Sequence, residues 1–259
     1  MKPEIDILIF GGQSNMQGGS EGIPTINEPV EGALEYHYLT DTLDTLCHPC
    51  SEPLGDPILL GEVVGGGNLA PDACRAYMQA TGMPVVVIHA ARGGTRIDEW
   101  LPGTDRYELA LKKLQAGLKK AAEYGNIRHI YYLWLQGESD AIHRTTEEQY
   151  IERLTLYKNA LKEAIGIEKF GIIEVGYFCC TVSWLTDRTK EDSKQCDEVI
   201  MGAQEKLPAI DEDFVLLTQI CKTISLDPEY INPDAEGHYN NKGLSLIGTE
   251  AGKALATLA

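Results

Sequence analysis

A serine lies in a glycine-rich segment, GGQSNM at 11–16, directly after a short apolar run. A hydroxyl in such a turn can act as a nucleophile when a neighbouring base removes its proton, and the backbone N–H groups of the turn can stabilise an oxyanion. The same segment is also typical of an ordinary turn in which the serine caps a helix. Ser14 is therefore a candidate nucleophile that needs partners elsewhere in the chain.

Three later segments place polar groups directly after apolar runs or before a helical pattern: ARGGTRIDEW at 91–100, WLQGESD at 134–140 and DAEGHYN at 234–240. The paired glycines of the first segment let the backbone approach a ligand closely and offer an N–H group. The second segment offers an amide donor and carboxylates, and the third offers a histidine that could serve as a general base. Taken singly, each segment is equally compatible with a turn, a helix cap or a structural histidine.

Regular elements must position these segments, and the hydrophobic pattern predicts them. Short apolar runs rich in β-branched residues are typical of buried parallel strands, whereas apolar residues at helical spacing predict amphipathic helices. Strands are predicted at 5–10, 84–90, 127–135, 171–178 and 213–219, and helices at about 69–81, 105–124, 145–165, 190–206 and 241–257. Because strand and helix alternate, the predicted fold class is α/β, with a doubly wound, mainly parallel sheet of five strands.

In such a sheet, ligands bind beyond the carboxyl ends of the strands, which is where most of the polar segments fall. The exception to the alternation is residues 17–67, which are rich in Gly and Pro and show little periodicity. We predict a long irregular loop there, of the kind that often forms a lid or a binding loop. The whole chain, 1–259, is predicted to be one domain that contains this loop.

Charge and composition exclude several classes of partner. The formal net charge of −17 disfavours nucleic acid and anionic membranes, because binding to phosphate depends on Lys and Arg. The same charge suits a neutral substrate such as a sugar ester. No run approaches the roughly 18 apolar residues that a membrane helix needs. We therefore predict a soluble protein whose partner is a small molecule or an oligosaccharide.

The cysteines and histidines show no pattern that indicates a disulfide framework or a metal site. The seven cysteines form an odd set, and no export signal is visible, so the predicted location is the cytoplasm. Cys47 and Cys50 form a CxxC pair, but His48 is the only nearby addition to a zinc site, which needs four ligands. His37 and His89 match no metal motif either. We predict no metal and no cofactor.

Together, the four segments resemble the SGNH hydrolases, in particular the branch of sialate O-acetylesterase-like and acetylxylan esterase domains of carbohydrate esterase family six. The segments GQSNM, GGT followed five residues later by Trp100, WLQGESD, and His238 with Gly243 five residues on occur in this order. The resemblance covers nearly the whole chain. It implies a three-layer α/β/α flavodoxin-like fold and a Ser-His-acid esterase that acts on acetylated carbohydrates without a metal or cofactor.

The resemblance also implies roles for individual residues. Ser14 would attack the ester carbonyl, and His238 would take its proton and pass it to the departing sugar hydroxyl. The oxyanion would be held by the N–H of Ser14, by the N–H of Gly94 (or Gly93), and by the side-chain amide of Gln136, which stands where classical SGNH enzymes use asparagine. The residues expected to contact the substrate are Gln13, Asn15, Gly93, Thr95 and Tyr239.

The sequence leaves more than one residue as a candidate for the acid of the triad. The family commonly shows an Asp three residues before the His, and here that position is Ala235. Some members of the branch use the Glu of the QGE segment to orient the histidine, which makes Glu138 the first choice. Asp234, four residues before His238, is the second choice. Glu236, two residues before it, is a third possibility.

Two other functions fit part of the pattern. A flavodoxin-like ligand-binding module would use Gly11 to Ser14 to cradle a phosphate at a helix N-terminus, but no P-loop lysine follows and the spacing is not GxGxxG. A catalytically silent carbohydrate binder on the esterase fold fits the altered spacing before His238, although a nucleophile, a base and oxyanion donors are all present. The leading hypothesis is O-deacetylation of a sugar or oligosaccharide through an acetyl-enzyme.

Overall fold

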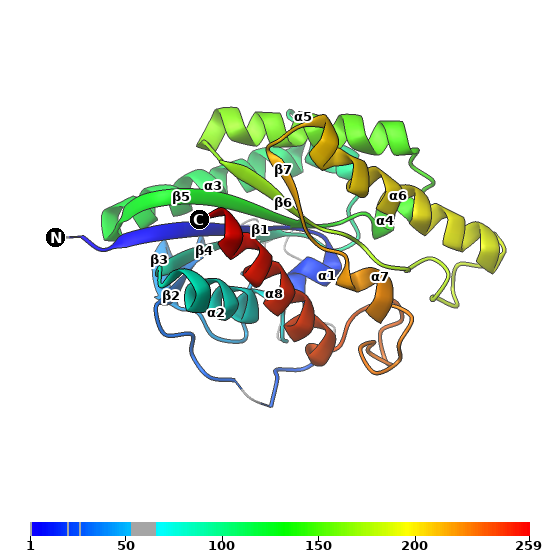
Figure 1. The fold of residues 1–259 in the computed structure, drawn as a ribbon, viewed down its shortest axis with the longest axis horizontal. Helices are drawn as coiled ribbons and strands as arrows, with labels where there is room; N and C mark the ends of the chain where they lie inside the picture. Colours follow the sequence, from blue (N-terminus) through cyan, green and yellow to red (C-terminus); the bar gives the residue numbers. More distant parts are fainter. Residues whose placement is uncertain (1, 20, 26, 53–65) are drawn as a thin grey trace.

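A seven-stranded sheet forms the centre of the computed structural model, which describes residues 2–19, 21–25, 27–52 and 66–259. The strands lie in the order β3-β2-β4-β1-β5-β6-β7 (Figure 1). Their bounds are β1 Glu4–Gly12, β2 Ala33–His37, β3 Thr42–Thr45, β4 Val85–Ala91, β5 Asn126–Leu135, β6 Lys169–Ile173 and β7 Phe214–Thr218. The β2–β3 pair is antiparallel, and the five other neighbouring pairs are parallel. The predicted mainly parallel sheet is confirmed.

The five predicted strands all form, but the sheet has two strands more than predicted. Strands β2 and β3 lie within residues 17–67, which were expected to be irregular. They form an antiparallel hairpin at the edge of the sheet, where β3 is largely exposed, so neither strand shows the continuous apolar run of a buried parallel strand. Residues 53–65 of that expected loop lie outside the described residues.

Helices cover both faces of the sheet. Figure 1 shows α2 and α8 on one face and α3, α5 and α6 on the other, so the predicted three-layer α/β/α fold is confirmed. The long helices are α2 Ala70–Thr81, α3 Asp105–Tyr124, α5 Glu147–Ile165, α6 Lys190–Ile210 and α8 Asn241–Leu255. Three short helices, α1 Ser14–Gln17, α4 Glu138–Ile142 and α7 Ile220–Ile224, follow β1, β5 and β7 within a few residues. Among the described residues, no helix is both long and apolar enough to cross a bilayer.

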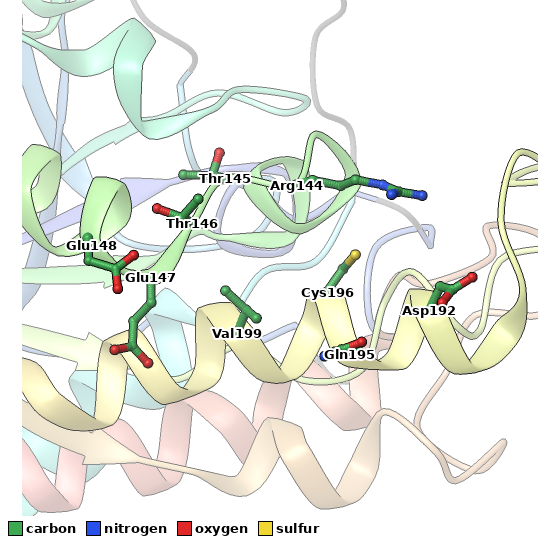
Figure 2. Close-up of a pocket in the computed structure, with 9 residues that line it drawn as sticks. All are labelled: Arg144, Thr145, Thr146, Glu147, Glu148, Asp192, Gln195, Cys196 and Val199. Atoms are coloured by element: carbon green, nitrogen blue, oxygen red, sulfur yellow. The ribbon is translucent and has the colours of Figure 1, made fainter.

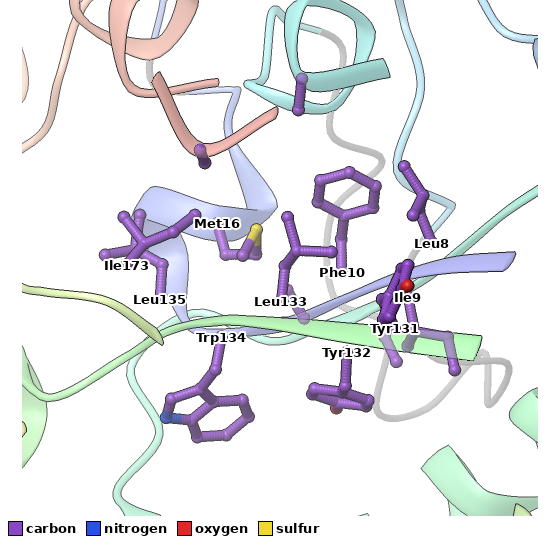
Figure 3. Close-up of a cluster of buried hydrophobic side chains, with 14 of the residues drawn as sticks. Leu8, Ile9, Phe10, Met16, Tyr131, Tyr132, Leu133, Trp134, Leu135 and Ile173 are labelled. Atoms are coloured by element: carbon purple, nitrogen blue, oxygen red, sulfur yellow. The ribbon is translucent and has the colours of Figure 1, made fainter. Parts of the chain in front are cut away.

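The core lies on both sides of the central strands. Figure 3 shows Trp134 and Tyr132 of β5 pointing to one side of the sheet and Leu133 and Leu135 to the other. Both aromatic rings contact Tyr157 of α5, at ring-to-ring distances of 5.3 and 6.0 Å. All four β5 side chains are fully buried. This two-sided burial explains why β5 appears in the sequence as an unbroken apolar run.

Helix α8 packs closely on α2 through two glycines. A Cβ atom on Gly252 would lie 2.2 Å from the carbonyl oxygen of Ala73, and one on Gly248 would lie 2.2 Å from the carbonyl oxygen of Leu69. The two helix backbones therefore touch at a distance that no side chain allows. This contact fixes α8 and, with it, the end of the preceding connection that carries His238.

We predict that Gly252→Ala lowers the free energy of unfolding by about 1–3 kcal/mol, because the added methyl group must displace the backbone of α2. Gly202→Ala on α6 is the matched control. Its Cβ atom would meet no atom closer than a Glu147 carboxylate oxygen at 3.5 Å, and alanine favours a helix over glycine by up to about 1 kcal/mol. Urea unfolding of the parent and both variants measures the difference. Equal stabilities for the two variants would contradict the close packing.

Candidate active site

Ser14 and His238 come together at the carboxyl end of the sheet. Ser14 is the first residue of α1, and His238 lies in the connection between α7 and α8. The His238 Nε2 atom is 3.0 Å from the Ser14 hydroxyl oxygen, although 224 residues separate them in sequence. The His238 Nδ1 atom lies 3.1 Å from the carbonyl oxygen of Glu236. When Nδ1–H donates to that carbonyl, Nε2 presents a lone pair to the hydroxyl, as a general base requires.

Two glycines let the backbone pass close to the nucleophile. Gly12 has a φ of +136°, and a Cβ atom there would lie 2.1 Å from the carbonyl oxygen of Leu135 on the neighbouring strand. Gly93, in the connection after β4, packs directly on Ser14, because a Cβ atom on it would lie 3.3 Å from the Ser14 Cβ atom. A larger residue at either position would disturb the turn that carries the hydroxyl.

The predicted oxyanion donors differ in whether their hydrogens are already used. The N–H of Gly93 donates to the side-chain oxygen of Gln17 at 2.7 Å. Within the described ranges, the N–H groups of Ser14 and Gly94 have no acceptor in the protein. Ser14 and Gly94 therefore keep N–H groups that an oxyanion can use, whereas Gly93 does not. Gln17 was missed in the sequence, where the only signal for it is its place one helical turn after the nucleophile.

The side chain of Gln136 does not match its predicted role as an oxyanion donor. Its Nε2 atom donates to the carbonyl oxygen of Thr95 at 2.9 Å and to Asp140 at 2.5 Å, and its oxygen accepts from the Tyr150 hydroxyl at 3.1 Å. The residue is completely buried. An amide with both hydrogens engaged cannot also bind an oxyanion. In this structure Gln136 joins the end of β5 to the connection after β4.

The residues predicted to contact the substrate also serve mainly to hold the loops. Gln13, Asn15, Thr95 and Tyr239 are each no more than 3% exposed. The Gln13 side-chain oxygen accepts from the N–H of Ser139 at 3.1 Å, and the Thr95 hydroxyl donates to the carbonyl of Arg92 at 2.8 Å. The Tyr239 hydroxyl donates to the carbonyl of Cys221 at 3.5 Å. Gly93, the fifth of these residues, is partly buried against Ser14.

Two of the predicted triad acids, Glu236 and Asp234, make no hydrogen bond to the histidine ring among the described residues. The Glu236 carboxylate accepts from the backbone N–H and the hydroxyl of Ser183, at 2.6 and 2.9 Å. Asp234 is exposed, and its N–H donates to the side chain of Asn232 at 2.9 Å. Neither carboxylate accepts from the His238 ring, whose Nδ1 atom is bonded to a backbone carbonyl instead. The tight turn before His238 directs a carbonyl, and not a side chain, at the ring.

Glu138, the first choice for the triad acid, contacts His238 only through an intermediate residue. The Asn15 side chain donates to the Glu138 carboxylate at 2.8 Å and reaches the carbonyl of Gly237 at 3.4 Å, while its oxygen accepts from the N–H of Tyr239 at 3.2 Å. Asn15 therefore holds the residues on both sides of the histidine. Burial raises the pKa of the Glu138 carboxyl, and the hydrogen bond from Asn15 partly offsets this rise. The geometry assigns Glu138 a positioning contact.

The surroundings of His238 favour its neutral form. Burial lowers the pKa of the imidazole, and the carbonyl groups of Glu236 and Ala235 oppose this effect only in part. The ring packs edge-to-face on Phe178, with 5.7 Å between the ring centres. Among the described residues, no carboxylate hydrogen-bonds to the ring to stabilise a positive charge. Phe178 lies in the connection after β6, at the end of a predicted strand, and was not singled out in the sequence.

A second histidine lies beneath the nucleophile in a structural role. The Nε2 atom of His89 lies 3.2 Å from the carbonyl of Met16 and 3.1 Å from the hydroxyl of Ser51. Burial lowers the pKa of His89 to about 3, so the ring is neutral. The Ser51 hydroxyl donates to the carbonyl of Gln17, which leaves its proton engaged. In the described part of the chain, no group of three His, Cys, Asp or Glu residues could hold a metal ion.

A separate cavity of about 390 Å³ lies between the start of α5 and the side of α6 (Figure 2). The residues that line it are Arg144, Thr145, Thr146, Glu147, Glu148, Asp192, Gln195, Cys196 and Val199. Neither Ser14 nor His238 is among them. The Thr145 hydroxyl donates to Asp140, so this cavity adjoins the residues that support the site and does not contain the nucleophile.

The fold and the Ser14–His238 pair define the class of protein. The three-layer α/β/α fold, with the serine directly after β1 and the histidine before α8, agrees with the arrangement that the resemblance to the SGNH hydrolases implies. More narrowly, the chain belongs to the family described as carbohydrate esterase, sialic acid-specific acetylesterase, whose model matches residues 4–215. The matched range includes the segments of Ser14, Gly94 and Gln136, and it ends before His238.

Similar proteins are found in a plant and in a bacterium. The chain is 28% identical over 192 residues to the probable carbohydrate esterase At4g34215 of Arabidopsis thaliana, covering 67% of this chain and 72% of that protein. The solved structure of the Arabidopsis protein aligns with a TM-score of 0.67 and 19% identity, over 100% of this chain and 98% of the other. XAC1771, a carbohydrate acetylesterase from Xanthomonas citri, aligns with a TM-score of 0.56 and 15% identity, over 98% of this chain and 57% of the other. The two structures support the fold.

We predict that kcat/KM for ester hydrolysis falls on the acid side with a midpoint below the ordinary histidine pKa of about 6.5. His238 accepts a proton only when neutral, and burial lowers its pKa, so the neutral form persists to lower pH than usual. A pH–rate profile measures the midpoint. A midpoint above 6.5 would show that a carboxylate contacts the ring, because a nearby negative charge raises the pKa of histidine.

We predict that Glu138→Gln lowers kcat by less than about tenfold, because the carboxamide oxygen can still accept from Asn15. Asn15→Ala removes the contacts on both sides of His238 and should lower kcat by about 10²-fold, the effect of a small displacement of a catalytic group. Steady-state kinetics of both variants, with circular dichroism as the folding control, tests this order. A loss of about 10⁴-fold in Glu138→Gln would mean that Glu138 bonds the histidine directly.

Proposed function

We propose that this protein is a serine esterase that removes O-acetyl groups from carbohydrates through an acetyl-enzyme. The observation that carries the proposal is the 3.0 Å contact between the His238 Nε2 atom and the Ser14 hydroxyl. The family, a carbohydrate esterase family, and the two relatives, a probable carbohydrate esterase and a carbohydrate acetylesterase, support a sugar ester as the substrate.

In the first half of the reaction, the Ser14 oxygen attacks the acetyl carbonyl while His238 takes the hydroxyl proton at Nε2. The oxyanion is stabilised by the N–H groups of Ser14 and Gly94. His238 then gives its proton to the sugar oxygen, and the carbon–oxygen bond to the sugar breaks. This step leaves an acetyl group on Ser14 and a free sugar hydroxyl.

In the second half, a water molecule attacks the acetyl-enzyme, and His238 takes a proton from the water. Collapse of the oxyanion intermediate returns this proton to the Ser14 oxygen and releases acetate. During both halves, the Glu236 carbonyl accepts from Nδ1–H and holds the ring in one tautomer. The proposed reaction uses only groups of the chain and water, and needs no cofactor.

The proposed substrate is a small acetylated sugar or oligosaccharide, either of the acetylxylan type or of the sialate type. A partner rich in phosphate is disfavoured by the net charge of −17. A cytoplasmic location is part of the proposal, and it is supported by the seven cysteines, which are all free.

We predict that Ser14→Ala reduces acetate release from 4-nitrophenyl acetate and from acetylated xylo-oligosaccharides by at least about 10³-fold, because the nucleophile is lost. Ser245→Ala, a partly exposed serine on α8, is the matched control and should leave the rate unchanged. Acetate is measured at equal concentrations of folded protein.

Three other results are informative. Activity that survives Ser14→Ala would mean that the nucleophile is a different residue. A folded parent protein that releases no acetate but binds the sugar would be a catalytically silent carbohydrate binder. A parent that instead binds a nucleotide or flavin tightly would be a flavodoxin-like binding module.

A further inference from the structure

One tryptophan differs from the other two in its exposure to solvent. The chain has three tryptophans. Trp100 and Trp134 are completely buried, whereas Trp184 is 55% exposed. Trp184 lies in the connection between β6 and α6, at the carboxyl end of the sheet. A large exposed aromatic ring at the end of the sheet where Ser14 and His238 lie is a typical feature of a ligand-binding surface.

The Trp184 ring is linked to the histidine by one intervening ring. Trp184 packs on Phe178 with 6.4 Å between the ring centres, and Phe178 packs on His238 with 5.7 Å between theirs. Phe178 is only 6% exposed, so it supports its two neighbours and offers little surface of its own. The exposed surface of Trp184 therefore lies one aromatic residue away from the general base.

The backbone beside Trp184 is fixed at two points. Ser183 donates from its N–H and its hydroxyl to Glu236, whose carbonyl orients the His238 ring. Earlier in the same connection between β6 and α6, the N–H of Cys179 donates at 3.0 Å to the buried carboxylate of Asp197. Because the segment is already ordered, a ligand that binds to it loses little conformational entropy.

We propose that Trp184 is the platform on which a pyranose ring of the acetylated substrate stacks while its acetyl group is presented to Ser14. One face of a pyranose ring carries mainly C–H groups, which pack favourably on the electron-rich face of an indole ring. The bonds between Ser183 and Glu236 then fix the position of the Trp184 ring relative to Ser14 and His238. This inference rests on the proposed esterase function and specifies how that site recognises a sugar.

The kinetic test compares an ester that contains a sugar with one that does not. Trp184→Ala should raise KM for xylose tetraacetate about 3- to 10-fold with little change in kcat, because stacking contributes equally to the ground state and the transition state. The same variant should leave both constants for ethyl acetate unchanged, because this ester has no ring to stack. Trp184→Phe should recover part of the lost affinity for the sugar ester.

The matched control is Tyr124→Ala, which removes another exposed aromatic ring. Tyr124 is 45% exposed and ends α3, just before β5 begins, so it lies at the opposite end of the sheet. Tyr124→Ala should change neither kcat nor KM for either ester. Equal losses on both esters in Trp184→Ala would show that the ring only supports His238, and no loss on either would show that the sugar does not stack there. Each result would overturn the proposal.

A binding measurement separates this proposal from the esterase function. Because the other two tryptophans are buried, acrylamide quenches mainly the fluorescence of Trp184. In Ser14→Ala, which binds without turnover, xylose tetraacetate should protect Trp184 from quenching, and the protection should disappear when Trp184→Phe is added. Protection in a protein whose parent releases no acetate from either ester would refute the esterase function alone. Protection that follows protein concentration instead of sugar concentration would make this surface a contact between copies and overturn the proposal.

Discussion

Polar side chains buried at the carboxyl end of the sheet must find partners inside the protein, because an unsatisfied buried polar group costs about 1–3 kcal/mol. Gln13, Asn15 and Gln136 meet this requirement by bonding to α4, to the connection before α8 and to the connection after β4, respectively. Each of these bonds joins two segments that are far apart in sequence. The geometry of Ser14 and His238 thus depends on three amides that take no part in proton transfer.

The partner of the histidine sets the character of the site. A carboxylate beside an imidazole stabilises its protonated form with a full negative charge, whereas the Glu236 carbonyl offers only a dipole. The carbonyl fixes the ring orientation and tautomer as well as a carboxylate would, but it does not raise the basicity of the ring. Such a histidine stays neutral and ready to accept a proton, and its positive charge is less stabilised once it has done so.

The features that can be predicted from the sequence are those determined by burial on two faces. Strands β1 and β4 to β7 lie between helical layers and appear as apolar runs, whereas the edge hairpin of β2 and β3 has no such pattern. Ser14 and His238 can be predicted because their segments directly follow a strand or precede a helix. The partners of Gln136 and of the His238 ring cannot, because they depend on the path of the loops. A shift of one residue in 234–238 decides whether a carboxylate or a carbonyl faces the ring.

The separation of the reacting pair in sequence has a consequence for synthesis of the chain. Ser14 leaves the ribosome before His238, which follows 224 residues later. The strands and helices that hold the serine can fold in the interval, but the nascent chain carries a hydroxyl with no base beside it. Only when α8 has been made and has docked on α2 does the histidine arrive. A chain that stops short of this helix therefore carries the nucleophile without its base, and hydrolysis of an ester reports that synthesis has passed His238.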